Sequence, residues 1–337
     1  ISTHANKLLD HYYQILSHDI NHHGYCTEFL GSSVGFEKTR LLCQTRCMYF
    51  LLEYAALNKD SYASNQAFTL YQLIKNKYQD IHQGETCYIF GDGPSIKWFD
   101  MSQFSDHICI SCGMIPMHND FNKLNIRYHL LLEPWFYCPS WMQPKYLKKN
   151  KHSVRFYRTF MKTHGSLDFF INATNFPWMA GKNINYVHRV LVTKNDKLQK
   201  VKSIVDPFGG SFHAVLSLAY LMGFSKVYLV GFDAWTIKPA RTKRWYELGK
   251  GEIFKRRGGL ALDFLNILKK EMDIYTISLE GESCNVKNIN YEQYTNKKSD
   301  FKENHQLLSK EYLNILDSFP KCEIYKKIND MEMKIKK

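Results

Sequence analysis

Residues 88–96 read Tyr-Ile-Phe-Gly-Asp-Gly-Pro-Ser-Ile, which predicts a buried strand that runs into a glycine-rich turn. The first three residues are aromatic or β-branched, as strands prefer. The two glycines permit close approaches that other residues forbid, and Pro94-Ser95 suits the start of a helix or turn. Open α/β sheets bind nucleotides at such turns. We therefore predict either a nucleotide site or a tight turn without a ligand, formed by Gly91, Asp92, Gly93 and Ser95.

This turn is neither a dinucleotide fingerprint nor a P-loop, because the third glycine and the Gly-Lys-Ser/Thr ending are missing. Its position does indicate where the α/β fold begins. From residue 85 onward, strand patterns alternate with helical ones. The expected strands are Cys87–Phe90, His107–Ser111, Tyr128–Leu132, Val154–Tyr157, Val187–Val192, Lys226–Val230 and Asp273–Ser278, and the expected helices are Ser211–Met222 and Gly259–Met272.

Strands separated by helices imply a mostly parallel sheet with helices on both faces. We therefore expect an α/β, Rossmann-like domain over residues 85–280. Residues 1–84 show helical stripes and predict a helical N-terminal region. Residues 281–337 are polar and rich in lysine and asparagine, which predicts a basic, partly helical C-terminal extension with a helix near residues 305–318.

The composition is that of a globular protein, with 337 residues of which 45% are hydrophobic. No run of 18 apolar residues and no signal peptide is found, so we expect a cytoplasmic protein that can lie peripherally at a membrane. Because the chain begins with Ile1, we expect that a longer N-terminal segment or an anchor has been removed. Nine cysteines at irregular spacings argue against a disulfide framework. Cys109 and Cys112 form a lone C-x-x-C, for which buried thiols are favoured over a redox pair or half a zinc site.

The formal net charge of +13 favours anionic partners such as nucleotide-sugars, glycolipids or an anionic membrane surface. A basic segment at residues 238–257 carries eight lysines and arginines against two acids. It is either a solvated face or a phosphate-binding surface, for which the candidates are Arg241, Arg244, Arg256 and Arg257. The lysine-rich last 17 residues are a second candidate for membrane or polymer contact.

A second pattern spans residues 206–233. It reads Asp-Pro-Phe-Gly-Gly-Ser-Phe-His, continues as a helix and a strand, and ends in Gly231-Phe232-Asp233. Gly209, Gly210 and Ser211 stand at the predicted amino terminus of the helix, where free amides and the helix dipole favour a phosphate or carboxylate. Asp233 follows a strand, at the edge where ligands bind. A plain start of a helix without a ligand is the alternative.

Together, Gly-Asp-Gly-Pro-Ser-Ile and the later Gly-Gly-Ser…Gly-Phe-Asp resemble the superfamily of bacterial CMP-sialic acid-dependent sialyltransferases of the lipo-oligosaccharide type. The superfamily also includes motility-accessory-factor proteins and archaeal-type pterin diphosphokinases. The resemblance covers about residues 86–280. It implies that Gly91, Asp92, Gly93 and Ser95 bind the nucleotide of a CMP-sugar, although the sialyltransferases carry Asn at the position of Asp92.

Four further positions are implied by the resemblance. Gly113 stands where the sialyltransferases have an Asn that contacts the donor. Glu133 stands where they have the Asn of an Asn-Pro pair, which also contacts the donor. Gly210-Ser211 matches a Thr-Ser pair near the cytidine and phosphate, and Trp235 matches a Tyr that holds the leaving phosphate. These departures leave open whether the donated sugar is sialic acid, another nonulosonic acid or Kdo.

The catalytic base of the sialyltransferases, a His before the late helix, has no counterpart in residues 252–259. A base is still required to take the proton of an acceptor hydroxyl. The candidates are His213, Glu133, Asp233 and Asp92, and for His213 a packing role in the helix is the alternative. No Asp-x-Asp occurs, so we expect neither a metal nor a cofactor beyond the CMP-sugar donor.

The resulting hypothesis is an inverting, metal-independent glycosyltransferase that moves an acidic sugar from a CMP-activated donor to a glycan, glycolipid or protein acceptor. The alternatives are a pterin diphosphokinase-like enzyme that uses ATP and magnesium, and a non-enzymatic binder of nucleic acid or another anionic polymer. No nucleic-acid motif is recognised, so we do not expect a nucleic-acid partner. The sequence leaves the oligomeric state open.

Overall fold

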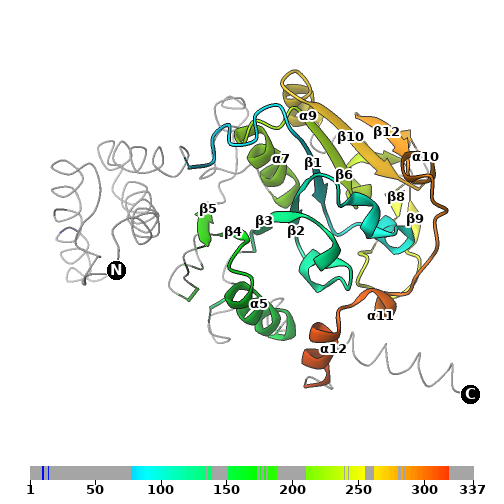
Figure 1. Ribbon diagram of the computed structural model, residues 1–337. Coiled ribbons are helices and arrows are strands. Elements are labelled where there is room, and N and C mark those ends of the chain that lie inside the picture. The colour runs from blue at the N-terminus through cyan, green and yellow to red at the C-terminus, as the bar shows by residue number, and fades with distance from the viewer. Residues whose placement is uncertain are drawn as a thin grey trace, which may run out of the picture.

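The computed structural model describes residues 77–318, together with Asp10 and Gln14 (Figure 1). Gaps within this range fall at residues 134–135, 139–150, 173–174, 176–177, 180, 182, 188–209, 239, 242, 255–261, 280–281 and 284–285. Most of the helical region expected at residues 1–84 therefore lies outside the described residues, as does the lysine-rich end of the chain.

An eight-stranded parallel sheet forms the centre of the molecule, in the order β12-β10-β6-β1-β2-β3-β4-β5. This arrangement confirms the predicted α/β, Rossmann-like fold. The strands are β1 (Thr86–Phe90), β2 (Ile108–Cys112), β3 (Ile126–Leu131), β4 (Asp168–Asn172), β5 (Ile184–Val187), β6 (Lys226–Val230), β10 (Asp273–Ser278) and β12 (Lys287–Asn290).

Alternation along β1 explains why both faces of the sheet are covered. Tyr88 and Phe90 point to one hydrophobic core, whereas Cys87 and Ile89 point to the other, and all four are buried. Helices α7 (Ser211–Leu221) and α9 (Leu262–Leu268) supply the second core. The first core is completed by α5 (Lys151–Thr163), α10 (Tyr291–Thr295), α11 (Asn304–Leu307), α12 (Lys310–Asp317) and the short 3-10 helices η2 (Pro94–Trp98), η3 (Met101–Phe104), η4 (Ile115–Met117) and η5 (Phe121–Lys123).

Two small antiparallel ladders and a short helix lie outside the main sheet. β7 (Ile237–Lys238) pairs with β11 (Glu282–Ser283), and β8 (Ala240–Arg241) pairs with β9 (Ile253–Phe254). Helix α8 (Asp233–Thr236) connects β6 to β7. The chain after β6 therefore folds into short elements before it returns to the sheet through α9 and β10.

One predicted strand is wrong, because Val154–Tyr157 lies inside helix α5. The buried residues of this helix recur at helical spacing, at positions 152, 153, 156, 157, 160 and 161. A four-residue window around Phe156 does not reveal this period. Figure 1 shows α5 beside α12, which covers its apolar side.

The strand expected at Val187–Val192 overlaps β5 only at Val187, and its other residues lie outside the described ones. Two strands of the main sheet were not predicted. β4 lies between α5 and β5, and β12 extends the sheet on its other side by pairing with β10. β12 lies after residue 280, so the described part of the expected C-terminal extension contributes to the same sheet. Leu307, Leu308 and Tyr312 from this part also belong to the first core.

Buried thiols are confirmed for the C-x-x-C of β2. Cys109 belongs to the first core and Cys112 to the second, so their side chains lie on opposite faces of the sheet. Burial raises the pKa of both thiols. Among the described residues, no helix has the length and apolar character to cross a bilayer.

Candidate functional site

The strand order changes direction beside β1. On one side of β1 lies β2, the next strand along the chain. On the other side lies β6, and beyond β6 lies β10. Ligands of open α/β sheets bind in the crevice outside the carboxyl ends of the strands at such a switch point. The loop Gly91–Ser95 follows β1 and the loop Gly231–Asp233 follows β6, so both predicted motifs meet at this point.

The two loops are bonded to each other through their backbones. The amide of Gly91 donates to the carbonyl of Val230 at 2.9 Å, and the amide of Gly93 donates to the carbonyl of Gly231 at 2.6 Å. A Cβ atom on Gly93 would lie 2.3 Å from Oδ2 of Asp233. Glycine is required here because the loops approach so closely, and this requirement exists whether or not a ligand binds.

Asp92 connects the switch point to two further segments. Its Oδ1 accepts hydrogen bonds from the amide of Met114 at 2.9 Å and from Nε1 of Trp245 at 3.2 Å. The amide of Trp245 also donates to the carbonyl of Asp92 at 3.1 Å. Among the described residues, no donor reaches the other oxygen, Oδ2. The carboxyl group is therefore fixed through Oδ1, whereas Oδ2 lies against the backbone of Gly113.

The environment of Asp92 makes its carboxyl group a weaker acid than usual. Burial raises the pKa of Asp92 to about 6, although the amide of Met114 and the positive charge of Arg244 oppose the rise. Gly113 makes room for this carboxylate, because a Cβ atom at Gly113 would lie 1.9 Å from Oδ2. The hydroxyl of Tyr157 in α5 donates to the carbonyl of Gly113 from the other side.

Asp233 and Ser95 hold the start of η2. The amide of Ser95 donates to Oδ2 of Asp233 at 3.0 Å, and both residues are buried. Asp233 thus has a defined structural role. The hydroxyl of Ser95 has no hydrogen-bond partner among the described residues. The side chain of Trp235, in the helix that follows Asp233, lies outside the described residues.

Helix α7 directs its amino terminus toward the same edge of the sheet. Its last turn lies at the opposite edge, where the carbonyl of Leu221 accepts from the amide of Asp80 at 3.0 Å. At its start, the ring of Phe212 lies 5.3 Å from that of Phe232, which follows β6. Gly210 adopts a φ of +147° immediately before the helix. Gly210 and Ser211 are thus close to the loop after β6, whereas Gly209 lies outside the described residues.

His213 packs against an aromatic side chain. Its ring lies 4.6 Å from that of Phe264 in α9, and burial lowers the pKa of His213 to about 4. The ring is therefore neutral at pH 7 and a weak base. Glu133 follows β3, which is two strands from β1 and thus about 10 Å away at ordinary strand spacing. The structure separates Glu133 from the switch point by the width of β2.

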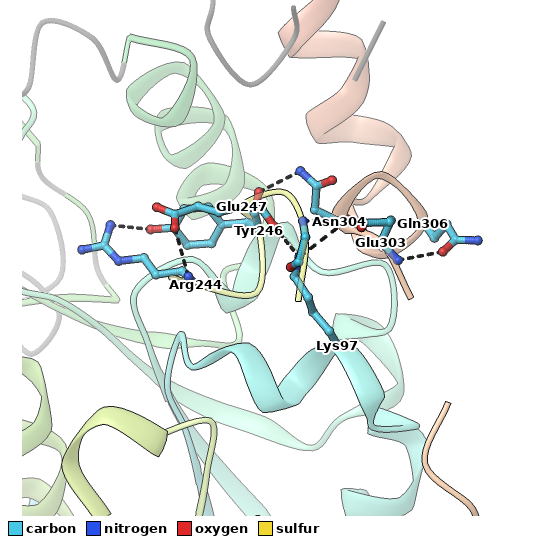
Figure 2. Close-up of polar contacts among 8 residues, drawn as sticks. Lys97, Arg244, Tyr246, Glu247, Glu303, Asn304 and Gln306 are labelled. Atoms are coloured by element: carbon cyan, nitrogen blue, oxygen red, sulfur yellow. Dashed lines mark hydrogen bonds and ion pairs between the residues drawn. The ribbon is translucent and has the colours of Figure 1, made fainter. Parts of the chain in front are cut away.

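Within the basic segment, residues 243–251 are described and include Lys243, Arg244 and Lys250. Figure 2 shows Arg244 beside Tyr246 and Glu247. Nη1 of Arg244 donates to the hydroxyl of Tyr246 at 2.7 Å, and its amide donates to Oε2 of Glu247 at 3.1 Å. Trp245, between them, is fully buried and lies 5.1 Å from the ring of His118. The side chains of Arg241, Arg256 and Arg257 lie outside the described residues.

Sequence reasoning missed three residues that hold this region together: Lys97, Met114 and Trp245. Each acts through a partner distant in sequence, so the local pattern around it carries little information. Lys97 did leave one signal, since it is the only charged residue in the apolar run from Ile96 to Phe99. Among the described residues, no group of three His, Cys, Asp or Glu side chains is arranged to hold a metal ion. No protein-family model, curated protein or solved structure matches this chain at a significant level.

Proposed function

We propose that this protein is a glycosyltransferase that moves an acidic sugar from a CMP-activated donor to a glycan, glycolipid or protein acceptor. One observation carries the proposal. The two motifs that resemble the sialyltransferase superfamily lie on adjacent strands, and their loops are hydrogen-bonded at the switch point. A nucleotide that binds in this crevice would contact both motifs at once.

The donor phosphate is assigned to two positive features near the crevice. One is the amino terminus of α7, where Ser211 begins the helix and the positive end of the helix dipole lies. The other is Arg244, an exposed residue that lies close enough to Asp92 to oppose the rise of its pKa. Both features would stabilise the negative charge that develops on the departing CMP. Gly113, Trp235, Arg241, Arg256 and Arg257 remain candidates for donor contacts.

Asp92 is the preferred proton acceptor among the four candidates. His213 is a weak base in an aromatic contact, Asp233 binds the amide of Ser95, and Glu133 is displaced from the crevice. In the proposed step, the acceptor hydroxyl oxygen forms a bond to the anomeric carbon while the bond to the phosphate oxygen breaks. The hydroxyl proton moves to Oδ2 of Asp92, and CMP leaves with the bonding electrons.

A ligand-dependent melting scan tests the proposal. The purified protein is heated with CMP, CDP, UDP, GDP or ATP, each with and without magnesium. A ligand at 100 times its Kd stabilises the native state by about 2.7 kcal/mol, which gives a measurable shift. We expect a shift with CMP that does not require magnesium, followed by hydrolysis or transfer of CMP-sialic acid, CMP-Kdo or another CMP-nonulosonate. No shift with CMP and no turnover of any CMP-sugar would contradict the proposal.

Two matched variants connect that result to the site. Arg244→Met removes a cation from the proposed phosphate site and should reduce the CMP shift. Lys123→Met removes a cation of η5 that pairs with Asp120 at 2.7 Å, and it should leave the shift unchanged. Equal shifts in both variants would place CMP elsewhere on the protein.

One observation favours a second candidate, a pterin diphosphokinase-like enzyme. Asp92 stands where the sialyltransferases carry Asn, so the switch point holds two carboxylates, Asp92 and Asp233. Magnesium is commonly bound by one or two carboxylates together with substrate phosphates. A melting shift that appears only with ATP and magnesium would support pyrophosphoryl transfer in place of glycosyl transfer.

A further inference from the structure

Lys97 is a buried cation beside the candidate site. Its side chain is 0% exposed, although lysine is almost never fully buried unless it is paired. Its Nζ donates to the carbonyls of Glu247 and Gly249, the latter at 2.7 Å. Nζ also lies 3.8 Å from Oε2 of Glu303 (Figure 2). Burial lowers the pKa of Lys97, and the charge of Glu303 opposes that effect.

The start of α11 binds the same segment beside Lys97. Oε2 of Glu303 accepts from the amide of Gly249 at 3.1 Å, and Nδ2 of Asn304 donates to the carbonyl of Tyr246 at 2.9 Å. Gln306 closes a capping box by accepting from the amide of Glu303 at 2.8 Å, which fixes the turn that presents these side chains. Lys97, Glu303 and Asn304, here called the latch, thus contact the backbone of the segment at three residues.

The segment held by the latch carries the groups that face the switch point. Trp245 binds Oδ1 of Asp92, and Arg244 stands beside the same carboxylate. Both residues lie within five positions of the carbonyls that the latch binds. A displacement of the backbone at residues 246–249 would therefore move the indole away from Asp92 and the guanidinium away from the crevice.

A purely apolar side chain in place of Lys97 would fill the same volume without directing these carbonyls. An ammonium group between two carbonyls and a carboxylate fixes both the position and the orientation of the loop that it binds. Backbone amides and carbonyls of an irregular loop have no strand partners to fix them otherwise. The polar contacts of the latch therefore specify one conformation of this segment.

We propose that Lys97, Glu303 and Asn304 are positioning residues, which hold residues 243–251 so that Trp245 orients Asp92 and Arg244 faces the ligand phosphate. This inference rests on the proposed function for the identity of the ligand. It assigns to the start of α11, about 200 residues after the Gly91–Ser95 loop, control over how tightly that ligand binds.

The test combines two measurements on Glu303→Gln, Asn304→Ala and Lys97→Met, with Glu311→Gln as the control. Glu311 is an exposed carboxylate of α12. Amide hydrogen exchange reports on peptides that cover residues 243–251, with peptides from β1 and β6 as internal references. We expect at least tenfold faster exchange in residues 243–251 for the latch variants, with unchanged exchange in the strands and no effect of Glu311→Gln.

Titration calorimetry with CMP provides the second measurement. Latch variants should raise the Kd for CMP about tenfold, and the effect should disappear when Arg244→Met is already present, because the segment then lacks the guanidinium proposed to face the phosphate. A merely structural role predicts additive effects in this double-mutant cycle. If Lys97→Met does not fold, Glu303→Gln and Asn304→Ala provide the same comparison.

The outcomes separate this inference from the proposed function. If wild-type protein does not bind CMP, the proposed function is wrong, and hydrogen exchange alone decides whether the latch positions the segment. Unchanged exchange in residues 243–251 overturns the positioning role whatever ligand binds. Faster exchange combined with an unchanged Kd for CMP overturns the link between the latch and the ligand.

Discussion

At the scale of single residues, Asp92 combines two properties that rarely occur together. Its Oδ1 is fixed by Met114 and Trp245, whereas its Oδ2 receives no hydrogen bond from the described residues. Burial raises its pKa to about 6, so the group changes charge just below neutral pH. The neutral form of this carboxyl group favours the folded state, whereas proton transfer requires the ionised form. Stability and turnover should therefore depend on pH in opposite directions.

The first prediction concerns stability. Because the pKa of Asp92 is raised in the folded state, its contribution is fully present below the unfolded value of 3.8 and is lost as the pH rises through about 6. Asp92→Asn keeps an oxygen acceptor and does not titrate. We compare the free energy of unfolding of Asp92→Asn with that of the wild type at each pH. The difference in favour of the variant should be about 1–3 kcal/mol larger at pH 8 than at pH 4. Urea denaturation at the two pH values measures this, and a difference that does not change with pH would refute the assignment.

The second prediction concerns turnover of a CMP-sugar. If Oδ2 accepts the acceptor proton, Asp92 must be ionised, so wild-type kcat should rise with pH through about 6. Asp92→Asn should lower kcat by a factor of about 10² to 10⁴ and abolish that rise. His213→Gln serves as the comparison, and a larger loss there than in Asp92→Asn would return the proton acceptor role to His213.

At the scale of elements, the loops after β1, β2 and β6 form one packed unit that glycine makes possible. Gly113 has a φ of +69° and would place a Cβ atom 1.9 Å from Asp92, whereas Gly84 has a φ of +80° and nothing within 4 Å of its Cβ position. The two glycines thus share a backbone conformation and differ in their surroundings. Comparing them separates the cost of strain from the cost of displacing Asp92.

The third prediction uses this pair. Gly84→Ala should cost about 1–2 kcal/mol, the penalty for a left-handed conformation with a Cβ atom. Gly113→Ala should cost a further 1–3 kcal/mol or so, because the carboxylate must move. Thermal or urea unfolding of both variants measures the costs. Tryptophan fluorescence, to which Trp245 and five other tryptophans contribute, should change only in Gly113→Ala. Equal costs with equal spectra would contradict the proposed packing.

Elements with a strong local signal could be predicted from the sequence. β1, β6 and β10 are short apolar runs and were found within one residue, as was the start of α7. α5 was mistaken for a strand because a four-residue window covers only about one helical turn and cannot show that the buried positions recur. In the site, sequence placed Ser95 and Asp233 each after a predicted strand. It did not reveal that these two strands are neighbours, which is what brings the two residues together. The contact between Trp245 and Asp92 spans 153 residues and leaves no local pattern, so sequence could not reveal it.

At the scale of the whole molecule, two buried histidines connect pH to the stability of the fold. Nδ1 of His118 accepts from the amide of Asp120 at 3.1 Å, and its ring lies 5.1 Å from Trp245. His129 lies 2.8 Å from the hydroxyl of Ser111 through Nδ1, and its ring stacks on Tyr157 at 5.6 Å. Burial lowers the pKa of His118 to about 4 and that of His129 to about 3. Both rings pack against residues of the first core and are neutral in the folded protein at pH 7.

The fourth prediction is therefore cooperative loss of stability on mild acidification. A histidine with a lowered folded pKa stabilises the fold above its unfolded pKa of 6.5, and that stability is lost as the pH falls toward the folded value. Between pH 6.5 and 5 each ring should cost about 2 kcal/mol, or about 4 kcal/mol together, while protonation of Asp92 restores about 1 kcal/mol. Urea unfolding across this range, repeated in the Asp92→Asn background, should give a slope near three protons at pH 5, because burial lowers the pKa of His213 to about 4 as well. His129→Phe should reduce that slope by about one proton, whatever the absolute stability of the variant. A free energy of unfolding that does not change with pH in this range would show that the rings are protonated in the folded state as easily as in the unfolded state.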